Sequence, residues 1–123
     1  MSVSALVIIP TYNERGNLPT LVGGLLRHEH VRVLVVDDQS PDGTGAVADG
    51  LAAQHPGRVQ VLHRTSAKGF GRSYIDGMRA ALNDTADVIC QMDADLSHDP
   101  AQLPALIAAQ PTRSGFTMPP RPT

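Results

Sequence analysis

The stretch from residue 5 to residue 38, ALVIIPTYNERGNLPTLVGGLLRHEHVRVLVVDD, decides the fold. It opens with a short apolar run at residues 5–9 that ends at Pro10, which is typical of a strand buried on both faces of a parallel sheet. A second apolar run follows at residues 31–36. Between the two runs, Asn17 can cap a helix whose leucines and valine recur at spacings of three and four residues. The stretch therefore predicts a strand–helix–strand unit.

The same alternation continues along the chain. The pattern predicts a helix over residues 44–54, a strand over 59–62, a glycine-rich loop, a helix over 73–83 and a strand over 87–92. Strands that alternate with helices indicate a three-layer α/β domain with a largely parallel sheet. A last helix is expected from Asp99, with Pro100 at its first position, Gln102 completing a capping box, and Pro104 bending or weakening it.

Length and composition set the domain organisation. A chain of 123 residues with 41% hydrophobic content has room for one domain and one core. We expect residues 1–110 to form this domain and residues 111–123, which contain four prolines and no apolar period, to be a disordered tail. Because an α/β domain that stops one helix after its fourth strand is small for its class, we expect a partial domain that belongs to a larger catalytic one.

Charge and cysteine content exclude several classes of function. The formal net charge is -2 and the basic residues are scattered, so we expect no binding to nucleic acid. The first ten residues lack the basic segment and the long apolar run of a signal peptide or membrane span, which predicts a cytoplasmic protein. The single cysteine, Cys90, lies in an apolar run and is interpreted as an inert buried thiol.

Candidate site residues follow the predicted strands, because ligands of open α/β sheets bind beyond the carboxyl ends of the strands. Four segments qualify: residues 10–14, 37–44, 68–71 and 93–95. Acidic residues are prominent in three of them, and carboxylates gathered at one edge repel one another unless a cation or hydrogen-bond donors hold them. A divalent metal ion is the economical explanation.

Asp93 and Asp95 are the best candidates for metal ligands. They lie two residues apart on extended backbone, so both carboxylates can face one cation. Ligation by oxygen alone favours Mg2+ or Mn2+ over zinc, and such an ion can stabilise a departing diphosphate. The alternative is that this segment is an ordinary acidic turn before the last helix.

The first two segments offer groups for a nucleotide. A carboxylate at Asp37 or Asp38 can accept hydrogen bonds from a nucleobase or from a ribose hydroxyl. Tyr12 can border the base, and Glu14 can accept from it. The alternatives are a packing role for Tyr12 and an ordering role for Asp38 within its loop. In the third segment, Lys68 and the following glycines can approach a phosphate, but the third glycine of a dinucleotide fingerprint is missing. The alternative is that Lys68 is an ordinary surface residue.

The four segments, in this order, resemble those of the inverting family 2 nucleotide-sugar glycosyltransferases over residues 3–109. The resemblance implies the GT-A, or nucleotide-diphospho-sugar transferase, fold. It implies that the nucleotide base and ribose are lined by Pro10, Tyr12, Glu14, Val35 and Asp37. It also implies that Asp93 and Ala94 lie beside the diphosphate and that Asp95, helped by Asp93, carries the metal ion.

Two further motifs are similar to those of the polyprenyl-phosphate mannose synthases within this family. They are DADLSH at residues 93–98 and the glycine, tyrosine and methionine pattern GFGRSYIDGM at residues 69–78. This resemblance implies transfer of mannose from GDP-mannose to a polyprenyl or dolichyl phosphate with inversion, dependence on Mg2+ or Mn2+, and Ser97 as a third metal ligand. The lipid acceptor implies work at the cytoplasmic face of a membrane, contacted through missing or partner segments. Gln39 departs from the family, which usually has glycine there.

Other functions compatible with the sequence stay open at this point. They are a polyprenyl-phosphate glucosyltransferase of the same family, a non-catalytic nucleotide-binding remnant, a dinucleotide-binding module, and an aspartyl phosphatase, whose nucleophile motif resembles MDADLS at residues 92–97. The first loop, TYNERGN, is not glycine-rich as a dinucleotide-binding module requires. The aspartyl phosphatase motif normally opens its domain, whereas the candidate here follows three predicted strands.

Overall fold

One parallel sheet organises the computed structural model, which describes residues 3–109 and 114–118. Within these residues the strand order is β3-β2-β1-β4-β5, and every neighbouring pair is parallel. The strands are β1 (Ala5–Thr11), β2 (Val31–Asp37), β3 (Val59–His63), β4 (Val88–Gln91) and β5 (Ser114–Thr117). The chain therefore builds the sheet outward from β1 in one direction and then returns to add β4 on the other side of β1.

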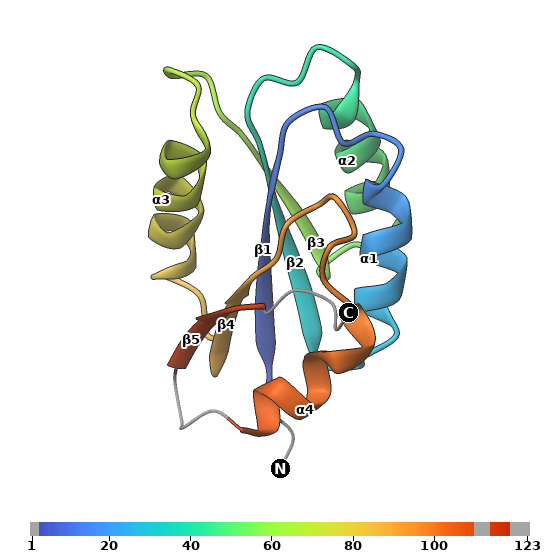
Figure 1. The fold of residues 1–123 in the computed structure, drawn as a ribbon, viewed down its shortest axis with the longest axis vertical. Coiled ribbons are helices and arrows are strands. Elements are labelled where there is room, and N and C mark those ends of the chain that lie inside the picture. The colour runs from blue at the N-terminus through green and yellow to red at the C-terminus, as the bar shows by residue number, and fades with distance from the viewer. Residues whose placement is uncertain (1–2, 110–113, 119–123) are drawn as a thin grey trace.

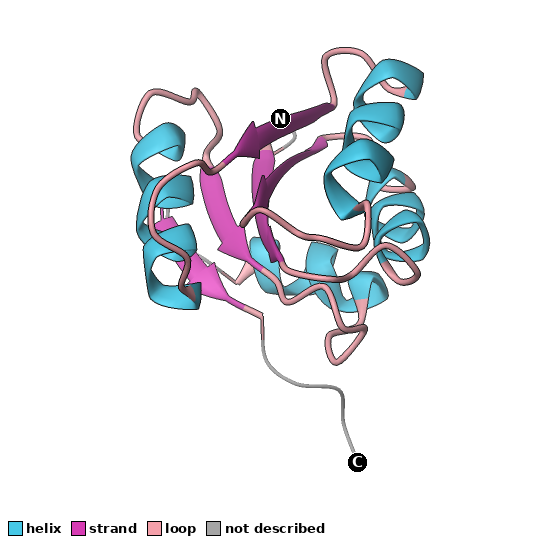
Figure 2. Cartoon of the chain, turned by 90° about the horizontal axis from the view of Figure 1, so that it is seen from above, coloured by secondary structure: helices cyan, strands magenta, loops and turns pink. Residues whose placement is uncertain are grey.

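Helices cover both faces of this sheet, as Figures 1 and 2 show. On one face lie α1 (Leu18–Leu26), α2 (Thr44–Gln54) and α4 (Leu103–Ala108), whose apolar residues share one core cluster with the strands. On the other face lies α3 (Phe70–Ala81), which shares a second, smaller cluster. The predicted three-layer α/β architecture is confirmed.

The two clusters explain why the strands read as continuous apolar runs. Successive side chains of a strand point to opposite faces. In β1, accordingly, Val7 and Ile9 belong to the cluster beneath α1, whereas Leu6 and Ile8 belong to the cluster beneath α3. Because both faces are covered, every residue of β1 is buried and polar alternation is absent.

The packing of α3 on the sheet depends on a glycine. A Cβ atom added at Gly77 would lie 2.7 Å from Cγ2 of Ile8 and 3.1 Å from Cγ2 of Val36. The helix therefore approaches β1 and β2 more closely than any side chain at this position allows. This close approach sets the distance between the middle of α3 and the sheet.

The region after β4 matches the expected helix start and differs in the helix itself. Asp99 accepts a hydrogen bond from the backbone N–H of Ala101 at 3.0 Å, and Pro100 occupies the first position, as predicted. The helix is divided into a 3-10 turn, Pro100–Gln102, and α4, which has Pro104 in its first turn. Proline has no N–H for a helix interior, which accounts for the division.

At α1 the predicted start is observed, but the side chain of Asn17 bonds Glu14 and makes no cap.

A fifth strand stands where the sequence analysis expected a disordered tail. Residues 114–117 pair with β4, from Val88↔Ser114 to Gln91↔Thr117, and the N–H of Met118 donates to the carbonyl of Gln91 at 2.9 Å. Met118 is buried in the larger core cluster. For these residues the expectation is wrong, because pairing with the open edge of β4 supplies order that no apolar period announces. Residues 111–113 and 119–123 lie outside the described residues.

Among the helices that the structure describes, none is long and apolar enough to cross a membrane.

Candidate nucleotide and metal site

The strand order places a ligand site between β1 and β4. After β1 the chain runs toward β2 and β3, whereas β4 lies on the opposite side of β1, and the diverging connections leave a crevice beyond the carboxyl ends of these two strands. A cavity of about 500 Å³ lies there. Its lining residues are Pro10, Thr11, Tyr12, Glu14, Asp38, Lys68, Gly69, Phe70, Ser73, Asp93, Ala94 and Asp95.

The loop after β1 forms one wall of this cavity. Tyr12 is exposed, and the Lys68 ammonium lies 5.0 Å from the centroid of its ring, within the range of a cation–π contact. The backbone N–H of Glu14 donates to Oγ1 of Thr44 at 2.9 Å, and that of Asn13 donates to Oγ of Ser40 at 3.0 Å. Both bonds fix this loop against the loop that follows β2. The aromatic ring is thus presented at the cavity on anchored backbone.

The segment after β4 forms the acidic wall. Asp93 and Asp95 both line the cavity, with the buried Ala94 between them. Asp95 accepts the backbone N–H of Ser97 at 3.0 Å, and hydrogen bonding from the Ser97 side chain is the main reason that the pKa of Asp95 lies below its ordinary value. On the Asp93 side, Nε2 of the buried His98 lies 3.4 Å from Oδ2 of Asp93. Asp95 therefore carries a negative charge at neutral pH.

These carboxylates suit a metal ion that takes the rest of its ligands from substrate. No group of three or more His, Cys, Asp or Glu residues within residues 3–109 and 114–118 is arranged to hold an ion by itself. Two carboxylates at a cavity wall match Mg2+ or Mn2+, which are commonly bound by one or two carboxylates together with phosphate oxygens and water. Ser97 does not line the cavity, and its contacts support Asp95.

The side chain of Asp37 forms its hydrogen bonds within the protein and does not face the cavity. Its Oδ1 accepts from the hydroxyls of Thr11 at 2.8 Å and Ser40 at 2.6 Å, and its Oδ2 accepts the backbone N–H of Ser40 at 3.2 Å. Its exposed fraction is 4%, and it is not among the cavity-lining residues. Val35, also predicted for the nucleotide wall, is fully buried in the larger core cluster. Both residues lie behind the wall they were expected to form.

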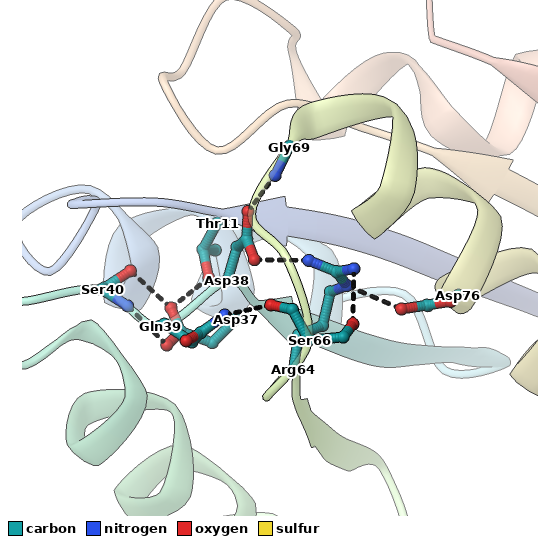
Figure 3. A network of polar contacts seen from close by, with 9 residues as sticks. All are labelled: Thr11, Asp37, Asp38, Gln39, Ser40, Arg64, Ser66, Gly69 and Asp76. Atoms are coloured by element: carbon teal, nitrogen blue, oxygen red, sulfur yellow. Dashed lines mark hydrogen bonds and ion pairs between the residues drawn. The ribbon is translucent and has the colours of Figure 1, made fainter.

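Asp38, the next residue, reaches the cavity and joins a network that ties three elements together (Figure 3). Oδ1 of Asp38 accepts from Nη1 of Arg64 at 2.5 Å, and its Oδ2 accepts the backbone N–H of Gly69 at 2.8 Å. Nε of Arg64 donates to Oδ2 of Asp76 in α3 at 2.6 Å, and its Nη2 donates to Oγ of Ser66 at 3.1 Å. The bonds to Asp76 and then to Asp38 raise the pKa of Arg64, so this buried guanidinium stays charged.

The amino-terminal end of α3 forms the third wall. Lys68, Gly69, Phe70 and Ser73 line the cavity, and the helix begins at Gly69 without a side-chain cap. The exposed fraction of Ser73 is 2%, and its Oγ has no hydrogen-bond partner among the described groups. A buried hydroxyl without a partner is costly, and a ligand in the cavity is one way to satisfy it. The glycine-rich motif marked this segment, but no pattern singled out Ser73.

The predicted residues thus divide into two groups. Six reach the cavity together, and three do not. The first group comprises Pro10, Tyr12, Glu14, Asp93, Ala94 and Asp95, and the second comprises Val35, Asp37 and Ser97. Thr11 and Phe70 fell within the candidate segments of the sequence but were given no role, and Ser73 fell outside them. Asp38 and Lys68 were considered both as ligand contacts and as ordinary loop or surface residues. Proximity to the glycine-rich loop was the available signal for Phe70 and Ser73.

Comparison with known proteins agrees with this geometry. The model of the family described as Glycosyl transferase family 2 matches residues 6–122. The polyprenol monophosphomannose synthase of Mycolicibacterium smegmatis is 54% identical over 108 residues, which cover 85% of this chain and 40% of the relative. The undecaprenyl-phosphate mannosyltransferase of Micrococcus luteus is 53% identical over 105 residues, covering 85% of this chain and 43% of the relative. The chain thus spans about two fifths of the length of these relatives.

A solved structure shares the fold. A mannosyltransferase from Pyrobaculum calidifontis, in complex with GDP-Man and Mn2+, superimposes with a TM-score of 0.73 at 25% sequence identity, covering 90% of this chain and 34% of that one. The expected GT-A type of α/β fold is confirmed. The family match and the shared fold both favour a glycosyltransferase over an aspartyl phosphatase or a dinucleotide-binding module.

Proposed function

Because the chain belongs to glycosyl transferase family 2, we propose that it is the donor-binding part of a transferase that moves mannose from GDP-mannose to a polyprenyl phosphate such as dolichyl phosphate. The observation that carries the proposal is the cavity between β1 and β4, in which Tyr12 and the Asp93–Asp95 segment share one space. Such a cavity offers an aromatic contact for a base and a carboxylate pair for a metal-bound diphosphate.

The order of the strands suggests how the donor lies in the cavity. The ends of β2, β1 and β4 are successive neighbours, so the ends of β2 and β4 are separated by two strand spacings, about 10 Å. We place the diphosphate and the metal ion on the β4 side, beside Asp93 and Asp95. The nucleoside then lies toward β2 and α3, bordered by Tyr12, where Lys68 and Ser73 offer hydrogen-bond donors.

In this arrangement Asp37 and Asp38 have different duties. Asp38 lines the cavity and holds the N–H of Gly69, which positions the start of α3. Asp37 holds Thr11 and Ser40, and so acts on the nucleotide wall from behind. Ser97 keeps Asp95 oriented and ionised, which is a supporting role for the metal site.

The transfer itself needs little acid–base chemistry from the protein. A phosphate monoester has a second pKa of about 6, so the acceptor is mostly ionised near neutral pH and needs no general base. One of its oxygens forms a bond to the anomeric carbon as the bond from that carbon to the diphosphate breaks on the opposite face. GDP leaves, and the product is a β-mannosyl phosphate lipid. Asp93 and Asp95 would hold a divalent cation there, and such a cation would neutralise charge on the departing diphosphate.

Competition between donors tests the assignment. We expect GDP-mannose to displace a fluorescent GDP analogue from the chain in the presence of Mn2+ at far lower concentration than UDP-glucose does. Tyr12→Ala should weaken GDP-mannose binding because it removes both the ring and the contact with Lys68. Equal or tighter binding of UDP-glucose would favour a glucosyltransferase of the same family and overturn the choice of donor.

A further inference from the structure

We propose that the outer face of α3 docks on an anionic lipid surface. This face, called the α3 outer face, consists of Lys68, Phe70, Arg72, Ile75, Arg79 and Leu82. The surface is argued from exposure and charge, while the choice of a bilayer as its occupant rests on the proposed lipid-phosphate acceptor.

Exposed large hydrophobic side chains are concentrated at α3. Within the described residues they are Val3, Tyr12, Phe70, Ile75 and Leu82. Phe70, Ile75 and Leu82 are exposed by 62%, 50% and 78%, and Tyr12 faces Lys68 beside the start of the helix. Such side chains prefer an apolar environment to water, so their clustering on one helix is a feature that a binding partner would satisfy.

The spacing aligns four of these residues along one side of the helix, whereas Phe70 lies at the start of the helix on the cavity side. Arg72, Ile75, Arg79 and Leu82 follow one another at intervals of three or four residues, which places them on one strip. All four are exposed, whereas Ser73, Gly77 and Ala81 on the opposite side are buried. Among the described helices, α3 is the one on this face of the sheet in Figures 1 and 2, and the exposure of the strip shows that it faces away from the sheet.

The charges of the α3 outer face favour an anionic partner. Lys68, Arg72 and Arg79 are exposed, and the acidic residue of the helix, Asp76, is paired with the buried Arg64. The whole chain has a formal net charge of -2, so an anionic surface would not attract the protein as a whole. Basic residues interleaved with large apolar ones match the interface of an anionic bilayer, where arginines meet headgroups and apolar side chains enter the acyl boundary.

The α3 outer face adjoins the donor cavity. Lys68 and Phe70 belong to the α3 outer face and also line the cavity. A bilayer against this face would therefore lie next to the cavity rim. Such docking would hold lipid phosphates close to the rim of the donor cavity.

Cosedimentation of the chain with lipid vesicles tests the proposal without nucleotide or metal, so it can fail while GDP binding stands. We expect binding to vesicles of phosphatidylcholine with phosphatidylglycerol, weaker binding to phosphatidylcholine alone, and loss of binding as salt is raised. Arg79→Glu should weaken binding by a factor of roughly 30, since each basic residue contributes about fivefold and a charge reversal changes the charge by two.

Arg27→Glu is the matched control, because Arg27 is an exposed arginine at the carboxyl end of α1, on the opposite face of the sheet. It should leave vesicle binding within about twofold. Ile75→Ser should weaken binding by about fivefold through lost apolar burial, whereas Val3→Ser, also at an exposed position, should not. Circular dichroism checks that each variant is folded.

Three results would overturn the proposal. They are an absence of vesicle binding by the unmodified chain, equal losses for Arg79→Glu and Arg27→Glu, and an unchanged affinity in Ile75→Ser. If the chain does not bind vesicles but dimerises at higher concentration, and Ile75→Ser abolishes the dimer, the α3 outer face would bind a second copy of the chain instead.

Discussion

Gln39 occupies a left-handed backbone conformation, with φ of 61°. It stands where the family that the sequence resembles usually has glycine. This conformation costs a residue with a Cβ atom about 1 to 2 kcal/mol. The Gln39 side chain donates from Nε2 to the carbonyl of Ser66 at 2.6 Å, an exposed bond that offsets part of this cost. The sequence alone could note the departure from glycine, but the compensating bond to Ser66 needed the fold.

The strain at Gln39 predicts an order of stabilities. Gln39→Gly and Gln39→Ala both lose the bond to Ser66, but only glycine relieves the backbone. We expect the glycine variant to be more stable than the alanine variant by about 1 kcal/mol in urea unfolding. Equal midpoints for the two variants would mean that φ relaxes in solution and that the position is not strained.

Ser73 provides a second prediction at this scale, in which stability and binding move in opposite directions. Its buried hydroxyl has no partner within the described part of the chain, so Ser73→Ala should leave the free energy of unfolding unchanged or slightly raised. If a nucleotide supplies the missing partner, the same variant should weaken GDP binding by about 0.5 to 1.5 kcal/mol.

Ser4→Ala is the matched control for Ser73→Ala. The Ser4 hydroxyl bonds Asp87 near the amino-terminal end of β1, away from the cavity. It should lower stability and leave GDP affinity alone. Unchanged GDP affinity in Ser73→Ala, measured by calorimetry, would remove this hydroxyl from the ligand wall.

Among the elements, α3 supplies the largest part of the cavity lining that the apolar periodicity did not predict. The apolar pattern predicted a helix over residues 73–83, whereas α3 runs from Phe70 to Ala81. Its first turn contains no buried apolar side chain, and its start is fixed by the bond between Asp38 and the N–H of Gly69. The two residues are 31 positions apart in the sequence, so a local sequence pattern could not reveal their contact.

Two glycines of α3 predict opposite effects of the same substitution. At Gly77 an added Cβ would clash with Ile8, so Gly77→Ala should lower the free energy of unfolding by about 1 to 3 kcal/mol. At Gly71 nothing lies within 4 Å of an added Cβ, so Gly71→Ala should raise it by up to about 1 kcal/mol through helix propensity. An unchanged or raised free energy of unfolding for Gly77→Ala, measured in urea, would contradict the close approach of α3 to the sheet.

The strands show which parts of the fold and site are readable from sequence. The runs that form β1, β2, β3 and β4 were predicted within a few residues, because each contains a short run of mainly apolar residues. β5 was missed, since the four residues SGFT carry no such run and gain their order from β4. At the end of β2 the two aspartates were hard to separate, because adjacent residues of a strand face opposite sides and a shift of one residue exchanges their roles.

For the molecule as a whole, Cys90 reports whether the chain unfolds cooperatively. The thiol is fully buried in the larger core cluster, and burial raises its pKa to about 12, so it stays protonated at pH 8. We expect alkylation at pH 8 to be slow in the native chain and to accelerate with urea in parallel with the loss of circular dichroism. Rapid alkylation without denaturant would show that the central sheet opens independently.

The central claim is that one cavity binds GDP and a divalent cation together through Asp93 and Asp95. Calorimetric titration with GDP, once with saturating Mn2+ and once with chelator, tests it most directly. We predict tighter binding with Mn2+ by roughly 5- to 150-fold, the usual range of coupling between two sites. Asp95→Asn should abolish most of this difference, while Asp49→Asn, at an exposed position on α2, should preserve it. Equal GDP affinity with Mn2+ and with chelator, unchanged by Asp95→Asn, would contradict the account.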